Sequence, residues 1–192
     1  MGVDNAIEVT LHPRLLLVVL ALLAGLLIAA PTASARRGCV SANATTAHAT
    51  KRAIVRATLC ALNHTRHHHG LHRLRLNQRL SRAARRHARD MARRNYFSHD
   101  TLGGGSFLDR IRRTGYLRGA HSWIVGENLA WGSKGYSRPQ VIMRMWMNSP
   151  GHRANILNAS FREIGIGVAY DAPVPHGGRP AGTYATDFGA KH

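Results

Sequence analysis

The segment from Asn77 to Met91 carries the pattern that most restricts how this chain can fold. Five apolar or small residues and one histidine recur at the spacing of one face of an α-helix, and arginines occupy the opposite face. The first set is Leu80, Ala83, Ala84, His87, Ala88 and Met91, and the second is Arg79, Arg82, Arg86, Arg89 and Arg93. Alanines on the inward face let this helix lie close to a sheet or a second helix. Asn77 is the predicted N-cap, and the pattern favours His87 as a core histidine over a ligand.

Shorter patterns predict the rest of a mixed domain. Helical spacing indicates a helix over 51–64, a short helix that begins with a capping box of Ser106 and Asp109, and a helix that begins at Ser137. The last is expected to bury Val141, Ile142, Met145 and Trp146. Strands are predicted over 123–125, 164–169 and 183–188, the last two paired through a Gly- and Pro-rich connection. These elements predict an α+β fold, a mixed sheet covered by helices.

The first 35 residues have the features of a secretory signal peptide. Arg14 precedes an apolar run over 15–30, and Ala33 and Ala35 form an Ala-x-Ala cleavage site. Sixteen residues of helix span about 24 Å, less than the roughly 30 Å of a bilayer core, which favours cleavage over a permanent anchor. We therefore expect a secreted protein that begins at Arg36 and has no transmembrane anchor after cleavage.

Both cysteines of the chain, Cys39 and Cys60, lie near this expected N-terminus. In an oxidising compartment an isolated pair predicts one disulfide, and the chain-entropy account gives such a loop about 3 kcal/mol of stability. We expect the bridge to tether an N-terminal segment, 36–56, to a main domain over 57–192.

The chain is strongly basic. Lys and Arg number 27 against 9 Asp and Glu, a net charge of +18, and cleavage would leave 26 basic and 7 acidic residues, a net charge of +19. This charge favours anionic envelope polymers or lipids as partners. A genome rich in G and C, whose codons favour arginine, is an alternative origin of the charge. No sequence-reading helix stands out, so specific nucleic-acid binding is not expected.

Three residues stand out among the few acids and the histidines. Glu127 lies among glycines and apolar residues, His99 follows an aromatic pair, and His152 follows Pro150 and Gly151. Two imidazoles and a carboxylate can bind zinc with an open position or transfer protons. Spacing alone does not bring the three together, and each is individually common as a hydrogen-bonded structural residue.

The other histidines and acids that could form a site are better explained by structural roles. His64, His68 and His72 are four residues apart and could line a helix face as metal ligands, but a solvated helix end is the favoured interpretation. Glu163 is expected at a strand entry, ion-paired to Arg153 or Arg162. The sequence contains no Gly-x-Ser-x-Gly and no P-loop, which disfavours a serine hydrolase and a nucleotide-binding enzyme.

Ordered motifs resemble those of one known family. Phe-Ser-His-Asp at 97–100, Gly-Glu-Asn-Leu-Ala-Trp-Gly at 126–132, and the segments 149–157, 161–168 and 184–189 follow one another as in bacterial members of the CAP superfamily. That superfamily includes the cysteine-rich secretory proteins, the sperm-coating-protein domains and the plant pathogenesis-related proteins. The resemblance covers about 57–189, within the main domain.

The resemblance implies a three-layer α-β-α sandwich with a cleft. In the family, two histidines and two acidic residues of the cleft can hold one divalent metal such as zinc. By motif match, His99 and His152 are the two histidines and metal ligands, and Glu127 is the first acid and a further candidate ligand. The second acid is expected on the helix before His152, which offers Gln140, Arg144 and Asn148 instead of a carboxylate.

Two functions remain open at this point. The favoured one is a secreted, non-enzymatic binding module that holds a lipid, a glycan or another envelope ligand in the cleft. The alternative is a metal-dependent hydrolase that acts on peptides or envelope polymers. Because one family acid is missing, we assign no residue a catalytic role. The sequence indicates no oligomeric state.

Overall fold

The structure, a computed structural model, describes Cys39 and residues 42–192. The predicted signal peptide and cleavage site lie outside the described residues. None of the helices in the described part has the length and hydropathy of a membrane span.

A mixed sheet forms the centre of the domain. Within the described residues its strands are β1 (Arg75–Leu76), β2 (Trp123–Ser133), β3 (Glu163–Ala169) and β4 (Ala181–Lys191), in the order β1-β3-β4-β2. β4 pairs antiparallel with both β2 and β3, and β1 pairs parallel with β3. β2 therefore has β4 on one side only, and its other edge is free to meet side chains from helices.

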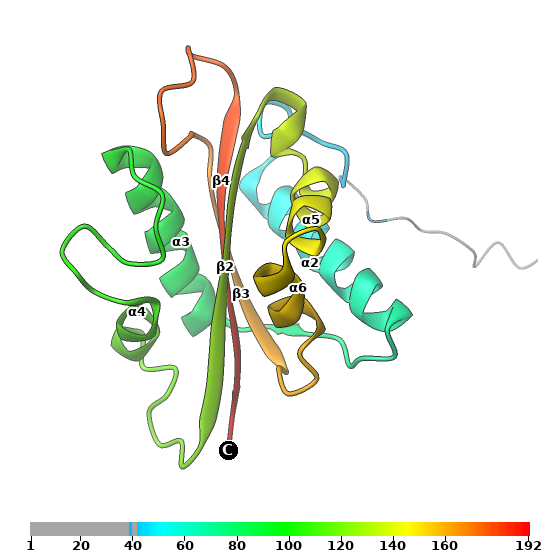
Figure 1. Cartoon of the computed structure of the whole chain (residues 1–192), viewed down its shortest axis with the longest axis vertical. Helices are drawn as coiled ribbons and strands as arrows, with labels where there is room; N and C mark the ends of the chain where they lie inside the picture. The colour runs from blue at the N-terminus through cyan, green and yellow to red at the C-terminus, as the bar shows by residue number, and fades with distance from the viewer. Residues whose placement is uncertain (1–38, 40–41) are drawn as a thin grey trace, which may run out of the picture. The chain divides into compact units, whose positions relative to one another are not determined.

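Helices cover both faces of this sheet. Figure 1 shows α3 (Gln78–Arg94) and α4 (Phe107–Arg113) on one face, with α2 (Lys51–His68), α5 (Pro139–Met147) and α6 (Pro150–Leu157) on the other. A short 3-10 helix, η1 (Lys134–Ser137), precedes α5. This arrangement confirms the predicted α+β fold and its three α-β-α layers.

The α3 layer packs backbone against backbone. A side chain at Gly165 would meet the backbone of Leu80 at 2.1 Å, and one at Gly167 would meet the backbone of Ala84 at 2.3 Å. The alternating glycines of β3 thus leave the space that the α3 backbone fills. The predicted stripe of α3 faces inward, and Asn77 caps the helix through hydrogen bonds to the backbone N–H of Arg79 and Leu80.

The larger apolar core lies on the opposite face. Trp146 and Ile142 from α5 pack with Phe161, Tyr184 and Phe188, and all five are buried. The Trp146 indole donates to the carbonyl of Leu129 at 2.9 Å, which holds α5 against β2. α5 and α6 are thereby fixed beside the free edge of β2.

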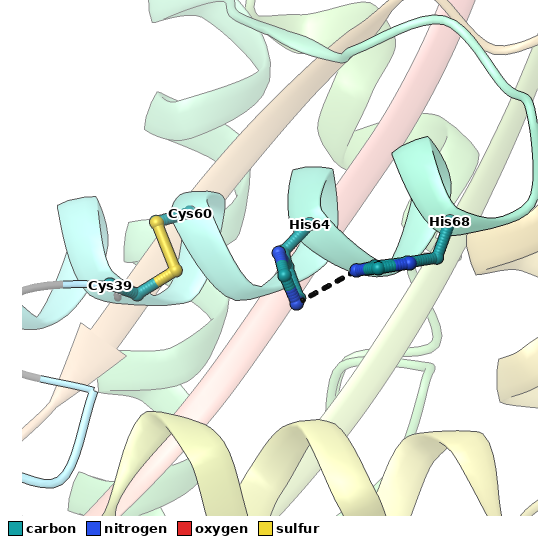
Figure 2. The surroundings of a disulfide bond; sticks show 4 residues. All are labelled: Cys39, Cys60, His64 and His68. Carbon is teal, nitrogen blue, oxygen red and sulfur yellow. Dashed lines mark hydrogen bonds between the residues drawn. A yellow bond between two sulfur atoms is a disulfide. The ribbon is translucent and has the colours of Figure 1, made fainter. Parts of the chain in front are cut away.

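The described residues before α2, Cys39 and 42–50, are bound to this second helical layer. Cys39 and Cys60 form the predicted disulfide, with their Cα atoms 5.5 Å apart (Figure 2). Thr46 adds a hydrogen bond from its hydroxyl to the carbonyl of Ala181 at 2.8 Å. The bridge and this bond tie the segment to α2 and to β4.

Several boundaries and orientations differ from the sequence expectations. β2 continues from 123 through 133, because the whole Gly-Glu-Asn-Leu-Ala-Trp-Gly segment pairs with β4. α2 continues to His68 instead of ending at 64. In α5, Met143 is buried and Met145 is 43% exposed, so the prediction of a buried Met145 is wrong. The helix begins at Pro139, and its inward face follows Ile142, Met143 and Trp146.

Glu163 also has partners other than those expected. Its carboxylate accepts hydrogen bonds from Asn77 Nδ2 at 2.9 Å and from the Tyr116 hydroxyl at 2.7 Å. No ion pair joins it to Arg153 or Arg162 among the described residues. Glu163 therefore links β3 to the cap of α3, and the predicted ion pair is wrong.

The close packing of α3 on β3 predicts a large effect of one methyl group. Gly167→Ala should destabilise the domain by about 3 kcal/mol, because the new Cβ must displace helix backbone. Urea unfolding followed by circular dichroism measures this loss. Gly103→Ala is the matched control, since a Cβ there meets no atom within 4 Å. Equal midpoints for the two variants would contradict this packing.

Candidate functional site

His99 lies in the segment that follows α3, and two hydrogen bonds fix that segment. α3 ends where Asn95 adopts a left-handed conformation, with φ of 53°. The buried His87 then donates from Nε2 to the carbonyl of Ser98 at 2.9 Å, and Arg110 donates to the carbonyl of His99 at 2.7 Å. His87 thus has the structural role that its place in the stripe predicted.

The His99 ring covers a buried carboxylate. His99 Nδ1 lies 2.8 Å from Oε1 of Glu127, whose side chain is 1% exposed, whereas the His99 side chain is 54% exposed. This hydrogen bond raises the pKa of His99 above its ordinary value, with burial acting in the opposite direction. His99 is therefore an exposed imidazole that retains its proton to higher pH than an ordinary histidine.

The second oxygen of Glu127 is held by an arginine. Nη2 of Arg110, from α4, lies 2.6 Å from Oε2, and the Arg110 side chain is 6% exposed. A buried carboxylate needs such a partner, because taking an unpaired charge out of water costs several kcal/mol. The sequence did not indicate Arg110 as a site residue, because an arginine in a short helix with several arginines is expected to be exposed to solvent.

A second carboxyl group lies directly across the sheet from Glu127. Asp187 of β4 is its cross-strand partner, so both side chains point to the α3 face. The carbonyl of Glu127 accepts from Asn155 Nδ2 at 3.1 Å on the free edge of β2, and so points away from β4. Glu127 and Asp187 therefore form a non-hydrogen-bonded pair of the antiparallel ladder, in which opposite Cα atoms are about 4.5 Å apart.

Asp187 is fully enclosed and differs from Glu127 in its surroundings. It is 1% exposed, and neither carboxyl oxygen accepts a hydrogen bond within the described structure. Burial, and then the negative charge of Glu127, raise the pKa of Asp187 well above its ordinary value. Of the two side chains, Glu127 is the one held by an arginine, whereas Asp187 has no charged partner. The sequence did not indicate Asp187 as a site residue, because only the strand register places it beside Glu127.

His152 enters the site from the other helical layer. It lies in the first turn of α6, and its carbonyl accepts from Asn128 Nδ2 at 3.0 Å. Burial, and then the positive charge of His99, lower the pKa of the half-buried His152 ring. His99 and His152 therefore occupy one electrostatic neighbourhood around β2, with the first favouring the protonated form and the second the neutral form.

The arrangement does not fit a metal site with three protein ligands. Both oxygens of Glu127 are already held, and Nδ1 of His99 faces that carboxylate. Across residues 42–192 and Cys39, no group of three His, Cys, Asp or Glu side chains is placed to hold a metal ion. A divalent metal on His99 and His152 stays a prediction, and we derive no chemical step from it.

A groove lies where α5 turns into α6. Its volume is about 390 Å³, and it is lined by Met147, Asn148, Pro150, Arg153, Ala154 and Leu157. This volume is in the range of small-molecule sites, which are mostly apolar with a few polar groups. The groove has that character, with the Arg153 guanidinium as its charged group.

Comparison with known proteins agrees with this architecture. The sequence model of CAP, the cysteine-rich secretory protein family, matches residues 59–176, more than half of the chain. The chain belongs to this family. YkwD of Bacillus subtilis (strain 168) is 39% identical over 105 residues, which are 55% of this chain and 38% of YkwD.

Solved structures give the same result. An extracellular protein of Bacillus anthracis that contains an SCP domain is 28% identical, with a TM-score of 0.56 over 73% of this chain and 43% of that one. An outer surface protein of Borrelia burgdorferi shares the fold, with a TM-score of 0.61, 18% identity, and coverage of 75% of this chain and 97% of that one. The chain thus spans less than half of YkwD and of the Bacillus anthracis protein.

The two histidines should titrate on opposite sides of pH 6.5, their ordinary midpoint. Glu127→Gln should lower the pKa of His99, because it removes the hydrogen bond to a carboxylate and its charge. NMR of the imidazole protons over a pH series measures both midpoints. Asp100→Asn is the control, since Asp100 raises the pKa of His99 least among its neighbours. An unchanged His99 midpoint in Glu127→Gln would contradict this pairing.

Proposed function

We propose that this protein is a secreted, non-enzymatic binding domain. One observation carries the proposal: the Glu127 carboxylate is buried, and both its oxygens are engaged by His99 and Arg110. A general base must reach the proton that it removes, and a metal ligand needs a free lone pair directed at the ion. Glu127 is almost wholly enclosed and already accepts two hydrogen bonds, so the site is better suited to fixing its own geometry and binding a ligand than to hydrolysis.

Export is supported by three features. The Cys39–Cys60 disulfide is of a kind that persists in oxidising compartments, and the similar Bacillus anthracis protein is extracellular. The apolar run over 15–30 followed by Ala-x-Ala adds the sequence argument for a cleaved signal peptide.

The ligand is proposed to be an anionic component of the cell envelope. The outer face of α3 presents seven exposed arginines: Arg79, Arg82, Arg85, Arg86, Arg89, Arg93 and Arg94. The only acid of that helix, Asp90, is already engaged by Arg94 and by the Tyr96 hydroxyl. This surface favours phosphate or carboxylate groups on a lipid headgroup or a polymer.

Binding to vesicles with phosphatidylglycerol tests the proposal. Each arginine near an anionic surface contributes about 1 kcal/mol, so Arg82→Gln, Arg86→Gln and Arg89→Gln combined should weaken binding at least tenfold. Arg52→Gln, Arg56→Gln and Arg73→Gln remove the same charge from other exposed positions and form the control. Binding of the parent protein should also fall steeply as salt rises through about 0.1 M, where the Debye length is about 10 Å.

Three results would contradict the proposal. Equal losses in the two triple variants would show a dependence on net charge alone, and salt-independent retention would exclude an electrostatic attachment. Zinc-stimulated cleavage of peptides or envelope polymers that disappears in both Glu127→Gln and His152→Ala would favour the alternative, a metal-dependent hydrolase.

A further inference from the structure

Two histidines on the outer surface of α2 point their ring nitrogens at one another. His64 and His68 are one helical turn apart and exposed, and their Nε2 atoms are 3.1 Å apart (Figure 2). Their rings are nearly perpendicular, at 77°. Neither residue belongs to the site around Glu127, which is formed by α4, α6, β2, β4 and the segment after α3.

The separation of the two nitrogens fits a shared metal ion. Imidazole nitrogens bind first-row metals at about 2.0–2.1 Å, so two nitrogens on one ion are about 2.9 Å apart at a right angle and about 3.3 Å apart at a tetrahedral angle. The observed 3.1 Å lies between these values. Small rotations of two exposed rings would direct both lone pairs at an ion, and the helix backbone already holds the spacing.

The local structure explains why this pair is set apart from its neighbours. α2 continues through His68, beyond its predicted end at 64, so both residues lie on one helical face. His69 uses Nδ1 in a hydrogen bond with the Thr65 carbonyl at 2.9 Å. His72 comes after Gly70, whose φ of 68° follows the helix end. His64 and His68 are therefore the two that converge.

The surrounding chemistry selects the kind of ion. α2 contains no Asp or Glu, so oxygen-seeking Mg²⁺ and Ca²⁺ have no side-chain carboxylate there. Cys60, one turn before His64, is bonded to Cys39 and supplies no thiolate (Figure 2). Neutral imidazoles alone favour late first-row divalent ions, and affinity in that series is greatest for Cu²⁺.

We propose that His64 and His68 form a two-histidine surface site for a late first-row divalent metal, with Cu²⁺ preferred over Ni²⁺ and Zn²⁺. Water completes the coordination of the ion. The site is separate from the cleft histidines, His99 and His152, and is independent of the proposed envelope binding.

Titration of the purified, oxidised protein with Cu²⁺ in a non-coordinating buffer tests this site. We expect one equivalent of tightly bound Cu²⁺, with an electron paramagnetic resonance spectrum that shows coupling to two nitrogens. His64→Gln and His68→Gln should each weaken binding at least tenfold. His67→Gln and His72→Gln, which change neighbouring exposed histidines, should alter it less than twofold. Circular dichroism checks that each variant is folded.

A second pair of variants separates this site from the cleft. His99→Ala combined with His152→Ala should leave the tight Cu²⁺ equivalent in place. The proposal would be overturned if the cleft variant lost the tight Cu²⁺ equivalent while His64→Gln and His68→Gln retained it. Equal weakening in His67→Gln and His64→Gln would also overturn it, because it would indicate diffuse binding by a histidine-rich surface.

Discussion

The buried ion pair between Arg110 and Glu127 joins the parts of the candidate site. Glu127 lies on β2 with 1% of its side chain exposed, where an unpaired charge would cost several kcal/mol. Arg110 of α4 supplies the opposite charge and also donates to the carbonyl of His99. One side chain thereby compensates the buried carboxylate, fixes α4 against the sheet and places the His99 ring over Glu127. The raised pKa of His99, the hydrogen bonds at both Glu127 oxygens and the position of the exposed His99 ring all depend on this pair.

Strand order and register complete the arrangement. Because β2 is paired on one side only, its free edge accepts Asn155 of α6, and this contact brings the α6 layer and His152 toward the site. Across the sheet, the register places Asp187 beside Glu127, and burial raises the pKa of Asp187 well above its ordinary value. The site therefore combines two acidic side chains, of which Asp187 has a strongly raised pKa, with one histidine whose pKa is raised and one whose pKa is lowered.

Features that depend on local sequence could be predicted, whereas those that depend on long-range pairing could not. The α3 stripe, the capping box of Ser106 and Asp109, and the disulfide follow from spacing and residue type, and the structure confirms them. Asp187 became a candidate only once the β2–β4 register was known. The predicted partners of Glu163 were wrong because its observed partner Tyr116 lies far from it in sequence and comes near it only in the fold. The motifs containing His99, Glu127 and His152 identified the family, but not the arginine that holds Glu127.

A double-mutant cycle on Arg110 and Glu127 tests this account most directly. Arg110→Met and Glu127→Leu should each destabilise the domain by about 3–5 kcal/mol, because each leaves a buried charge unpaired. The double variant should lose much less than the sum, which gives a coupling energy of at least about 2 kcal/mol from urea unfolding. The exposed pair of Arg94 and Asp90 provides the reference, with an expected coupling below about 1 kcal/mol. Additive losses for Arg110 and Glu127 would contradict a site organised by their ion pair.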